Sequence, residues 1–286
     1  MSKPVVSVLL PVYNTPNVFL KECIESILTQ TFTDFELIIV NDASTDISVE
    51  TTVLSYDDKR IRYYKNKENM GISRTRNKLL DLADGTYLAI MDHDDVSLPT
   101  RFEKQVSYLN NHPDVGVVSS KIRQIPGNKE TNPPIENKDI ELALMKYCVI
   151  MHPASMVRKS VLIDNDIRYE ETYSPAEDYA LWLRLIGHTK FHNIPEVLFL
   201  YRFHATNTSK TQKNKMEKAT FALHALAQTV RPQTYNEFLL RAERSLYIRL
   251  CGIPLIKIRT TGYKTIVFLF NKLPVFSIKK QDKLKP

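Results

Sequence analysis

The sequence predicts an α/β protein with a mostly parallel central sheet, followed by C-terminal helices and a basic amphipathic tail. Short runs rich in Val, Ile and Leu alternate with helix-like segments through the first 120 residues, an order typical of parallel sheets covered by helices. Four of those runs end directly in polar clusters. The composition, with 43% hydrophobic and 25% charged residues over 286 positions, is ordinary for a folded chain.

Strands are predicted where apolar and β-branched residues form short runs bounded by polar or turn residues. These runs are residues 5–10, 36–40, 61–64, 87–91, 115–119, 151–158 and 197–203. Helices are predicted where apolar residues recur at helical spacing, as at Val18, Leu20, Ile24 and Ile27 within residues 17–30. The other predicted helices are residues 72–83, 99–109, 175–186, 211–230 and 233–250, and a loop is predicted over residues 126–137.

A polar cluster follows each of the first four predicted strands. The clusters are Pro11–Asn14, Asn41–Asp46, Asn66–Gly71 and Asp92–Asp95. Because the carboxyl ends of parallel strands meet at one edge of a sheet, where such sheets bind ligands, we expect one shared site rather than four separate turns.

The last of these clusters is acidic. Asp92, Asp94 and Asp95 concentrate negative charge at the end of an apolar run. Like charges this close repel each other, and a divalent cation relieves the repulsion. Oxygen ligands favour Mg²⁺ or Mn²⁺, which keep positions open for phosphate oxygens. A solvated acidic turn ahead of the helix at Pro99 is the alternative, and the cluster alone favours neither.

Several other residues have both a chemical and a structural interpretation. Glu177 and Asp178 open a predicted apolar helix, where a carboxylate can cap the helix or act as a general base toward a hydroxyl. Asp42 can accept a hydrogen bond from a nucleotide base or cap a turn. Gly71 permits close approach of the backbone to a ligand.

Two histidines and the single tryptophan also have both a functional and a structural interpretation. His152 and His204 can each contact phosphate, metal or an acceptor, or serve as hydrogen-bonded structural residues. Trp182 fits a core position or a pocket wall.

The positive charge is concentrated near the C-terminus. Residues 241–286 hold 11 Lys or Arg against two acids, a net charge of +9, which leaves −2 for residues 1–240. Two apolar clusters that repeat at a spacing of 20 residues lie beside these cations. This pattern suits attachment to an anionic membrane surface, whereas single-strand nucleic-acid binding would call for stacking aromatic residues interleaved with the basic ones, an arrangement that the tail lacks.

The expected location is the cytoplasm, at the inner face of the plasma membrane. No run reaches the roughly 18 apolar residues of a membrane-spanning helix. Three widely spaced cysteines suggest neither a disulfide framework nor a zinc motif, which fits a reducing compartment.

The motifs, taken in their order along the chain, resemble those of a known family. Val8 to Asn14, Asn41 to Asp46, Asn69 to Asn77, Asp92 to Asp95 and Glu177-Asp178, taken together, resemble the family 2 glycosyltransferases over about residues 4–205. Asn41-Asp42-Ala43 departs from the commoner Asp-Asp-Gly at the second motif.

The resemblance implies a GT-A fold, a nucleotide-sugar donor, and transfer with inversion to a saccharide or lipid-linked saccharide acceptor. Mn²⁺ or Mg²⁺ would assist, with a UDP-sugar as the expected donor. The implied domains are residues 1–208 for the transferase, 209–250 for a helical segment and 251–286 for the membrane-associating tail. The implied roles are donor binding by Pro11, Tyr13, Asn14, Asp42, Gly71, Arg76 and Asp92; metal binding by Asp94 and His204; catalysis by Asp178 as base; and acceptor binding by His152, Glu177 and Trp182.

Two other functions are compatible with parts of the sequence. A sugar-phosphate nucleotidyltransferase also needs a nucleotide and Mg²⁺, but it calls for a Gly-rich loop after the first strand, where this chain has Pro-Val-Tyr-Asn-Thr-Pro. A non-enzymatic module that binds a membrane or nucleic acid through the basic tail is the other.

Overall fold

The structure is a computed structural model that describes residues 3–205, 207–241, 244–250, 253–260, 264–269 and 273–279. The chain divides into two compact units, Met1–Val230 and Arg231–Pro286. Within the described ranges, no helix combines the length and the apolar character needed to cross a lipid bilayer.

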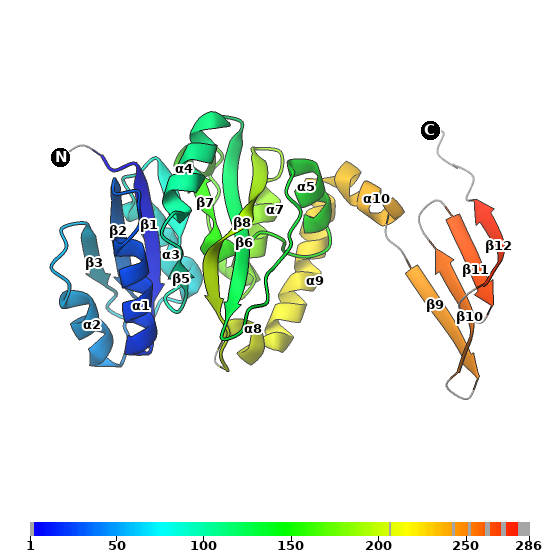
Figure 1. Ribbon diagram of the computed structural model, residues 1–286, viewed down its shortest axis with the longest axis horizontal. Coiled ribbons are helices and arrows are strands. Elements are labelled where there is room, and N and C mark those ends of the chain that lie inside the picture. Colours follow the sequence, from blue (N-terminus) through cyan, green and yellow to red (C-terminus); the bar gives the residue numbers. More distant parts are fainter. Residues whose placement is uncertain are drawn as a thin grey trace. The chain divides into compact units, whose positions relative to one another are not determined.

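The described strands of the first unit form an eight-stranded sheet (Figure 1). They are β1 (Val6–Val12), β2 (Phe35–Asn41), β3 (Ile61–Lys65), β4 (Tyr87–Ile90), β5 (Val96–Ser97), β6 (Val115–Ile125), β7 (Met156–Arg158) and β8 (Lys190–Arg202). Their order is β3-β2-β1-β4-β7-β6-β8-β5. Strands β3, β2, β1 and β4 run parallel, and so do β6 and β8. Antiparallel pairing involves β7 and β5, so the sheet is mixed, and the expected α/β class with a mostly parallel sheet is confirmed.

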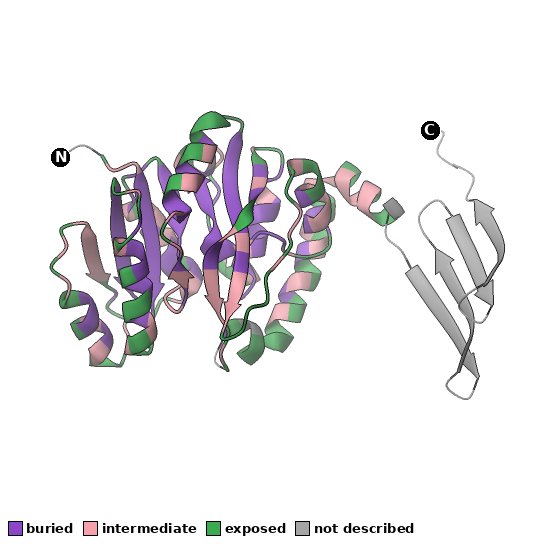
Figure 2. Ribbon diagram, viewed as in Figure 1, coloured by how far each residue is buried: buried purple, intermediate pink, exposed green. Residues whose placement is uncertain are grey.

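Helices cover this sheet on both faces. They are α1 (Asn17–Leu28), α2 (Ile47–Leu54), α3 (Ile72–Leu82), α4 (Arg101–Asn111), α5 (Asn137–Leu144), α6 (Lys159–Ile163), α7 (Glu177–Leu185), α8 (Thr208–Thr211) and α9 (Lys213–Val230). One core cluster joins Val8 and Leu10 of β1 to apolar residues of α1, α2 and α4. Successive residues of a strand point to opposite faces, so the equally buried Leu9 and Ile38 line the other face. Figure 2 shows the central strands buried and the outer sides of the helices exposed.

The amino ends of the parallel strands are joined by a buried polar cluster. Ser7 Oγ donates a hydrogen bond to Glu36 Oε1 (2.6 Å) and accepts one from the Gly85 N–H (2.8 Å). Glu36 Oε1 also accepts from the Asp84 N–H (2.8 Å), and Arg62 pairs with the same carboxylate. A Cβ on Gly85 would lie 2.6 Å from the Ser7 backbone N. The cluster therefore aligns β1, β2 and β4, whose opposite ends carry the predicted site.

Most predicted elements of the first unit lie within a few residues of observed ones. The predicted strand 151–158 is an exception, because His152–Ala154 forms a 3-10 turn and only Met156–Arg158 pairs as β7. Pro153 has no N–H to donate to a strand ladder, which explains the late start of the strand. Helices α2 and α5 are additions to the sequence prediction.

The second unit corrects one prediction. A helix was expected over residues 233–250, but α10 spans Pro232–Arg241 and Arg244–Leu250 forms strand β9. With β10 (Ile253–Thr260), β11 (Lys264–Leu269) and β12 (Leu273–Lys279), β9 builds an antiparallel sheet of order β12-β11-β10-β9. Pairing of β9 with β10 thus overrides the local helical pattern.

The repeated apolar clusters of the tail fall on β10 and β12 of this sheet. The side chains from residue 240 onward lie outside the described part of the chain. The charged, membrane-facing surface expected of the tail therefore stays a prediction.

Candidate active site

The loops after β2 and β3 are joined through the Asp42 carboxylate. Asp42 is buried, and its Oδ1 accepts hydrogen bonds from Asn66 Nδ2 (2.7 Å) and from the Met70 N–H (2.9 Å). Its Oδ2 accepts from the Gly71 N–H (2.9 Å). Gly71 has a φ of 81°, and a Cβ there would meet no atom within 4 Å. Backbone conformation therefore favours glycine here, and the space beside it is open to a ligand.

The loop after β1 meets the loop after β2 at the same edge. Asn14 Oδ1 accepts a hydrogen bond from the Thr45 N–H (2.9 Å), and the Asn14 N–H donates to Ser44 Oγ (2.9 Å). Pro11 is buried at the end of β1, whereas 44% of Tyr13 is exposed and available for contact. The structure thus brings together the residues predicted to line a nucleoside pocket, and Asn14 is engaged in fixing the loops.

The acidic loop after β4 meets the end of β8. Asp94 Oδ2 lies 2.7 Å from His204 Nε2, although 110 positions separate the two residues. The Arg202 N–H donates to Asp95 Oδ1 (2.7 Å), and Arg202 Nε donates to the Asp94 carbonyl oxygen (2.7 Å). Strand β8 therefore brings His204 to the acidic loop.

Two carboxylates of this loop, Asp95 and Asp92, have a raised pKa. Burial raises the pKa of Asp95 well above its usual value, and the charges of Asp94 and Asp92 raise it further. Burial also raises the pKa of Asp92, and the neighbouring guanidinium of Arg76 opposes this effect. Negative charge crowded in this way is the condition under which a bound cation stabilises a site.

Arg76 of α3 donates hydrogen bonds to two carboxylates. Its Nη1 donates to Glu177 Oε1 (2.6 Å) and its Nη2 donates to Asp92 Oδ1 (3.1 Å). Its guanidinium carbon lies 5.5 Å from the centre of the Tyr169 ring, and only 8% of Arg76 is exposed. The structure thus joins one predicted donor residue, Asp92, to one predicted acceptor residue, Glu177.

Asp178 lies in the first turn of α7. Its Oδ1 accepts a hydrogen bond from the Tyr179 N–H (2.7 Å). Burial raises the pKa of Asp178 to about 6, and the adjacent charge of Glu177 adds to this effect while Arg76 opposes it. A carboxylate with this pKa is ionised at neutral pH and still basic enough to accept a proton, as a general base requires.

His152 and Trp182 are the two buried residues among the predicted acceptor contacts beside Glu177. His152 is buried, and its Nε2 lies 2.9 Å from the Tyr169 hydroxyl oxygen. Its ring centre is 5.7 Å from the ring centre of Trp182, which is fully buried. Burial lowers the pKa of His152 well below its usual value, with Arg76 adding to the effect. These two predicted acceptor residues therefore pack as a buried wall of the site.

The donor atoms at the acidic loop fit a partly coordinated cation. Among the described residues, no three His, Cys, Asp or Glu side chains are grouped to hold a metal ion by themselves. Asp94 and His204 nevertheless place an oxygen and a nitrogen side by side. Mg²⁺ in phosphate-binding sites typically takes one or two carboxylates and completes its shell with phosphate oxygens and water.

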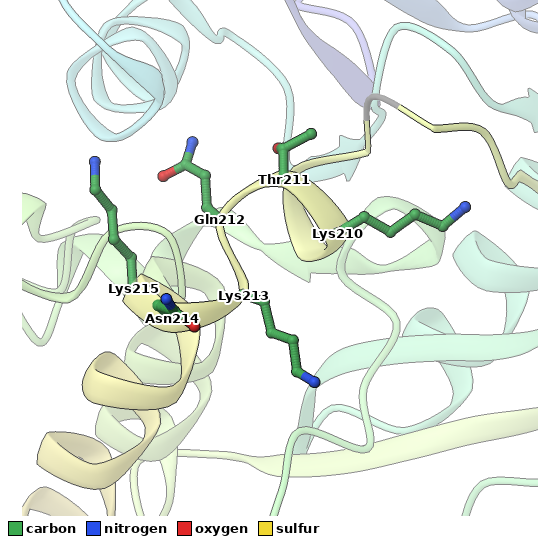
Figure 3. A pocket seen from close by; sticks show the side chains of 6 residues that line it. All are labelled: Lys210, Thr211, Gln212, Lys213, Asn214 and Lys215. Carbon is green, nitrogen blue, oxygen red and sulfur yellow. The ribbon is translucent and has the colours of Figure 1, made fainter.

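A surface hollow is lined by other residues. It has a volume of about 440 Å³ and is lined by residues 210–215, at the turn between α8 and α9. Figure 3 shows the side chains of Lys210, Lys213 and Lys215 pointing away from one another rather than converging. The hollow includes none of the predicted site residues.

The comparisons with known proteins decide the family. Residues 7–166 match Glycosyl transferase family 2. The chain belongs to this family. It is 39% identical over 210 residues to an uncharacterized glycosyltransferase of Methanocaldococcus jannaschii, covering 71% of this chain and 72% of the relative. It is 32% identical over 225 residues to the O-antigen biosynthesis glycosyltransferase WbnJ of Escherichia coli, covering 76% and 85%.

Solved structures share the fold of this family 2 glycosyltransferase. TarS residues 1–349 of S. aureus, in complex with UDP-GlcNAc, superposes with a TM-score of 0.67 at 19% identity, covering 82% of this chain and 71% of that one. The mannosyltransferase PcManGT of Pyrobaculum calidifontis, in complex with GDP-Man and Mn²⁺, gives a TM-score of 0.58 at 18% identity, covering 83% and 74%. The GT-A-like fold expected from the motifs is therefore confirmed.

Two residues of this glycosyltransferase's site were missing from the sequence prediction. Tyr169 contacts both Arg76 and His152, and Arg202 ties β8 to the acidic loop. Tyr169 lies between predicted elements, where no periodic pattern marks it. Arg202 stands two positions before His204, and that proximity was the available signal.

Proposed function

We propose that this glycosyltransferase moves a hexosyl or N-acetylhexosaminyl group from a nucleoside diphosphate sugar to an acceptor hydroxyl, with inversion at the anomeric carbon. The proposal depends on three features that come from separate elements. Asp178 lies in the first turn of α7, Asp94 follows β4, and Asp42 holds the loop after β3. A base and a diphosphate-binding edge are the two requirements of a single in-line displacement.

Asp178 is the proposed base. It removes the proton from the acceptor hydroxyl as that oxygen attacks the anomeric carbon, and the bond to the nucleoside diphosphate breaks. A pKa of about 6 and a place in the first turn of α7 support this role. Glu177, Trp182 and His152 are proposed to shape the acceptor side.

Asp94 and His204 are the residues proposed to hold Mn²⁺ or Mg²⁺. Such an ion supplies charge stabilisation for the leaving diphosphate. Pro11, Tyr13, Asn14, Asp42, Gly71 and Asp92 are proposed to contact the nucleoside and phosphates. The exposed ring of Tyr13 and the open space beside Gly71 support this assignment.

A UDP-sugar is the proposed donor, and a cell-surface glycan or lipid-linked saccharide is the proposed acceptor. The donor follows from TarS, which was solved with UDP-GlcNAc, and PcManGT, solved with GDP-Man, is the reason to include guanosine donors in the test. The acceptor follows from WbnJ, which is named for O-antigen biosynthesis. Membership of family 2 favours sugar transfer over the nucleotidyl transfer and the non-enzymatic binding considered above.

The proposal is tested by replacing the base. Asp178→Asn keeps the size of the side chain and removes its basicity, so we expect kcat to fall by about 10²- to 10⁴-fold. Donor affinity, measured by calorimetry, should stay within about threefold, because the amide occupies the same space. Asp57→Ala, at an exposed residue away from the site, is the control. An Asp178→Asn chain that loses donor binding as strongly as turnover would remove Asp178 from the base role.

A further inference from the structure

Arg76 and its neighbour Asn77 on α3 both form hydrogen bonds to residues 169–177, the segment that leads into α7. The Arg76 guanidinium bonds the carboxylate of Glu177, the first residue of α7. Asn77 Nδ2 donates to the Tyr169 carbonyl oxygen (2.8 Å), and Asn77 Oδ1 accepts from the Tyr169 N–H (3.0 Å). Through Arg76 and Asn77, helix α3 thus holds this chain segment both before α7 and at its first residue.

The same guanidinium reaches the acidic loop through Asp92. We propose that Arg76 is a positioning residue rather than a donor-phosphate contact. It ties the base-bearing end of α7 to the end of β4, and so fixes Asp178 relative to the donor. This inference rests on the proposed role of Asp178 as the base.

The surroundings of Arg76 argue against direct phosphate binding. Its side chain is 10% exposed, and both Nη atoms donate to carboxylates. Two carboxylates against one guanidinium leave the cluster without excess positive charge to attract a diphosphate. The ring of Tyr169 also lies over the guanidinium.

Fixing Glu177 fixes the first turn of α7. Residues 177 and 178 are adjacent, and a helical backbone leaves little freedom between neighbours. The bond from Arg76 to Glu177 is buried, with side-chain exposures of 10% and 5%, so water competes weakly for either group. Removing one partner of such a pair leaves an uncompensated buried charge.

Arg76 and Glu177 have opposite effects on the charge of Asp178. Glu177 raises the pKa of Asp178 and Arg76 lowers it. The other groups that act with Asp178 electrostatically are Asp92 at the end of β4, Tyr169 and Cys148. Neutralising Arg76 should therefore move the titration of Asp178 to higher pH, and neutralising Glu177 should move it to lower pH.

The experiment compares Arg76→Met and Glu177→Gln in the full chain. The pH profile of kcat/KM reports the base of the free enzyme, and calorimetry reports donor affinity. For Arg76→Met we expect the acidic limb to move up by about half a pH unit or more and kcat to fall at least about tenfold. Its donor Kd should stay within about threefold. For Glu177→Gln we expect the acidic limb to move down.

Arg74→Met is the matched control. Arg74 lies on the same helix and pairs with Glu171 at 2.6 Å, but both side chains are more than half exposed. Because an exposed ion pair contributes little, its kcat/KM and pH profile should match the parent chain within about twofold.

Three results would overturn the inference. An Arg76→Met chain that behaves like Arg74→Met removes any role for the residue. One with an unmoved acidic limb and donor binding weakened about tenfold makes Arg76 a donor contact. If Arg76→Met does not fold, Glu177→Gln provides the test. An acidic limb of its kcat/KM profile that matches the parent chain would refute the electrostatic coupling to Asp178. Absence of sugar transfer by the parent chain would instead count against the proposed function.

Discussion

At the scale of single residues, the environment of Asp178 sets its chemistry. An aspartate in water has a pKa too low for it to be an effective base near neutral pH. Burial raises the pKa of this one to about 6, and Glu177 contributes in the same direction. Arg76 opposes the shift, so the carboxylate stays ionised at neutral pH. Desolvation and two fixed charges thus set the pKa of a carboxylate that suits the proposed base.

The pH dependence of turnover follows from this pKa. The active form carries the ionised Asp178, so kcat/KM should be constant above about pH 7 and fall as pH drops through about 6. Well below that pKa the decline should approach tenfold per pH unit. The measurement is the initial rate of nucleoside diphosphate release between pH 5 and 8. A profile that is flat down to about pH 4.5 would mean that no group with a raised pKa acts as the base.

At the scale of elements, the two ends of the parallel strands have different roles, one in stability and the other in the candidate site. The amino ends of β1 and β2 carry the buried cluster of Ser7, Glu36 and Gly85, which aligns the strands. The carboxyl ends carry the candidate site, as in other open α/β sheets. Stability and turnover should therefore be separable by mutation.

Ser7→Ala tests that separation. The substitution removes the hydroxyl that accepts from the buried Gly85 N–H and donates to Glu36, so the free energy of unfolding should fall by about 1–3 kcal/mol. The kcat of the folded protein should stay within about twofold, because the hydroxyl lies at the far end of β1. Chemical denaturation and steady-state kinetics measure the two quantities. Ser55→Ala, at an exposed residue whose hydroxyl donates to the Thr52 carbonyl oxygen of its own helix, is the control. Loss of turnover at unchanged stability would contradict this division.

Sequence periodicity predicted the elements better than it predicted the contacts between them. The strands and helices of the first unit follow from local apolar patterns, and the shared edge follows from their order. Helix α2 was missed because two of its apolar residues, Ile47 and Leu54, face solvent and blur the helical pattern. Residues 244–250 look helical locally, and only pairing with β10 makes them a strand.

The site shows the same limit. The motifs predicted which residues gather at the edge, but the partners of Arg76 lie 16 and 101 positions away. The resemblance therefore implied a donor contact for Arg76, and the sequence could not reveal a buried guanidinium between two acids. Asp94 and His204 were each candidates from the residues themselves, but they lie 110 positions apart, and only the resemblance to a family assigned them to one metal site.

At the scale of the whole molecule, the charge separates into two regions. Residues 241–286 carry a net charge of +9, whereas residues 1–240 carry −2. We propose, as the sequence predicted, that the C-terminal region attaches the enzyme to an anionic membrane surface near a lipid-linked acceptor.

Removing that region tests the attachment. A chain that ends at residue 240 should lose most of its sedimentation with vesicles containing anionic lipid, and the loss should match the effect of raising the salt concentration on the full chain. Vesicles of neutral lipid are the control, since they offer little charge attraction to either chain. Equal sedimentation of the two chains with anionic vesicles would rule out attachment through residues 241–286.

The proposed binding of a cation at Asp94 offers the most direct test of how the donor is held. Calorimetric titration with UDP, with GDP as the alternative nucleotide, in the presence and absence of Mn²⁺ should give binding that strengthens with the metal in the parent chain. Asp94→Ala should abolish that metal dependence, whereas the exposed-site control Asp57→Ala should retain it. The same Mn²⁺-dependent gain in affinity in Asp94→Ala as in the parent chain, or no binding of either nucleotide to the parent chain, would contradict the account.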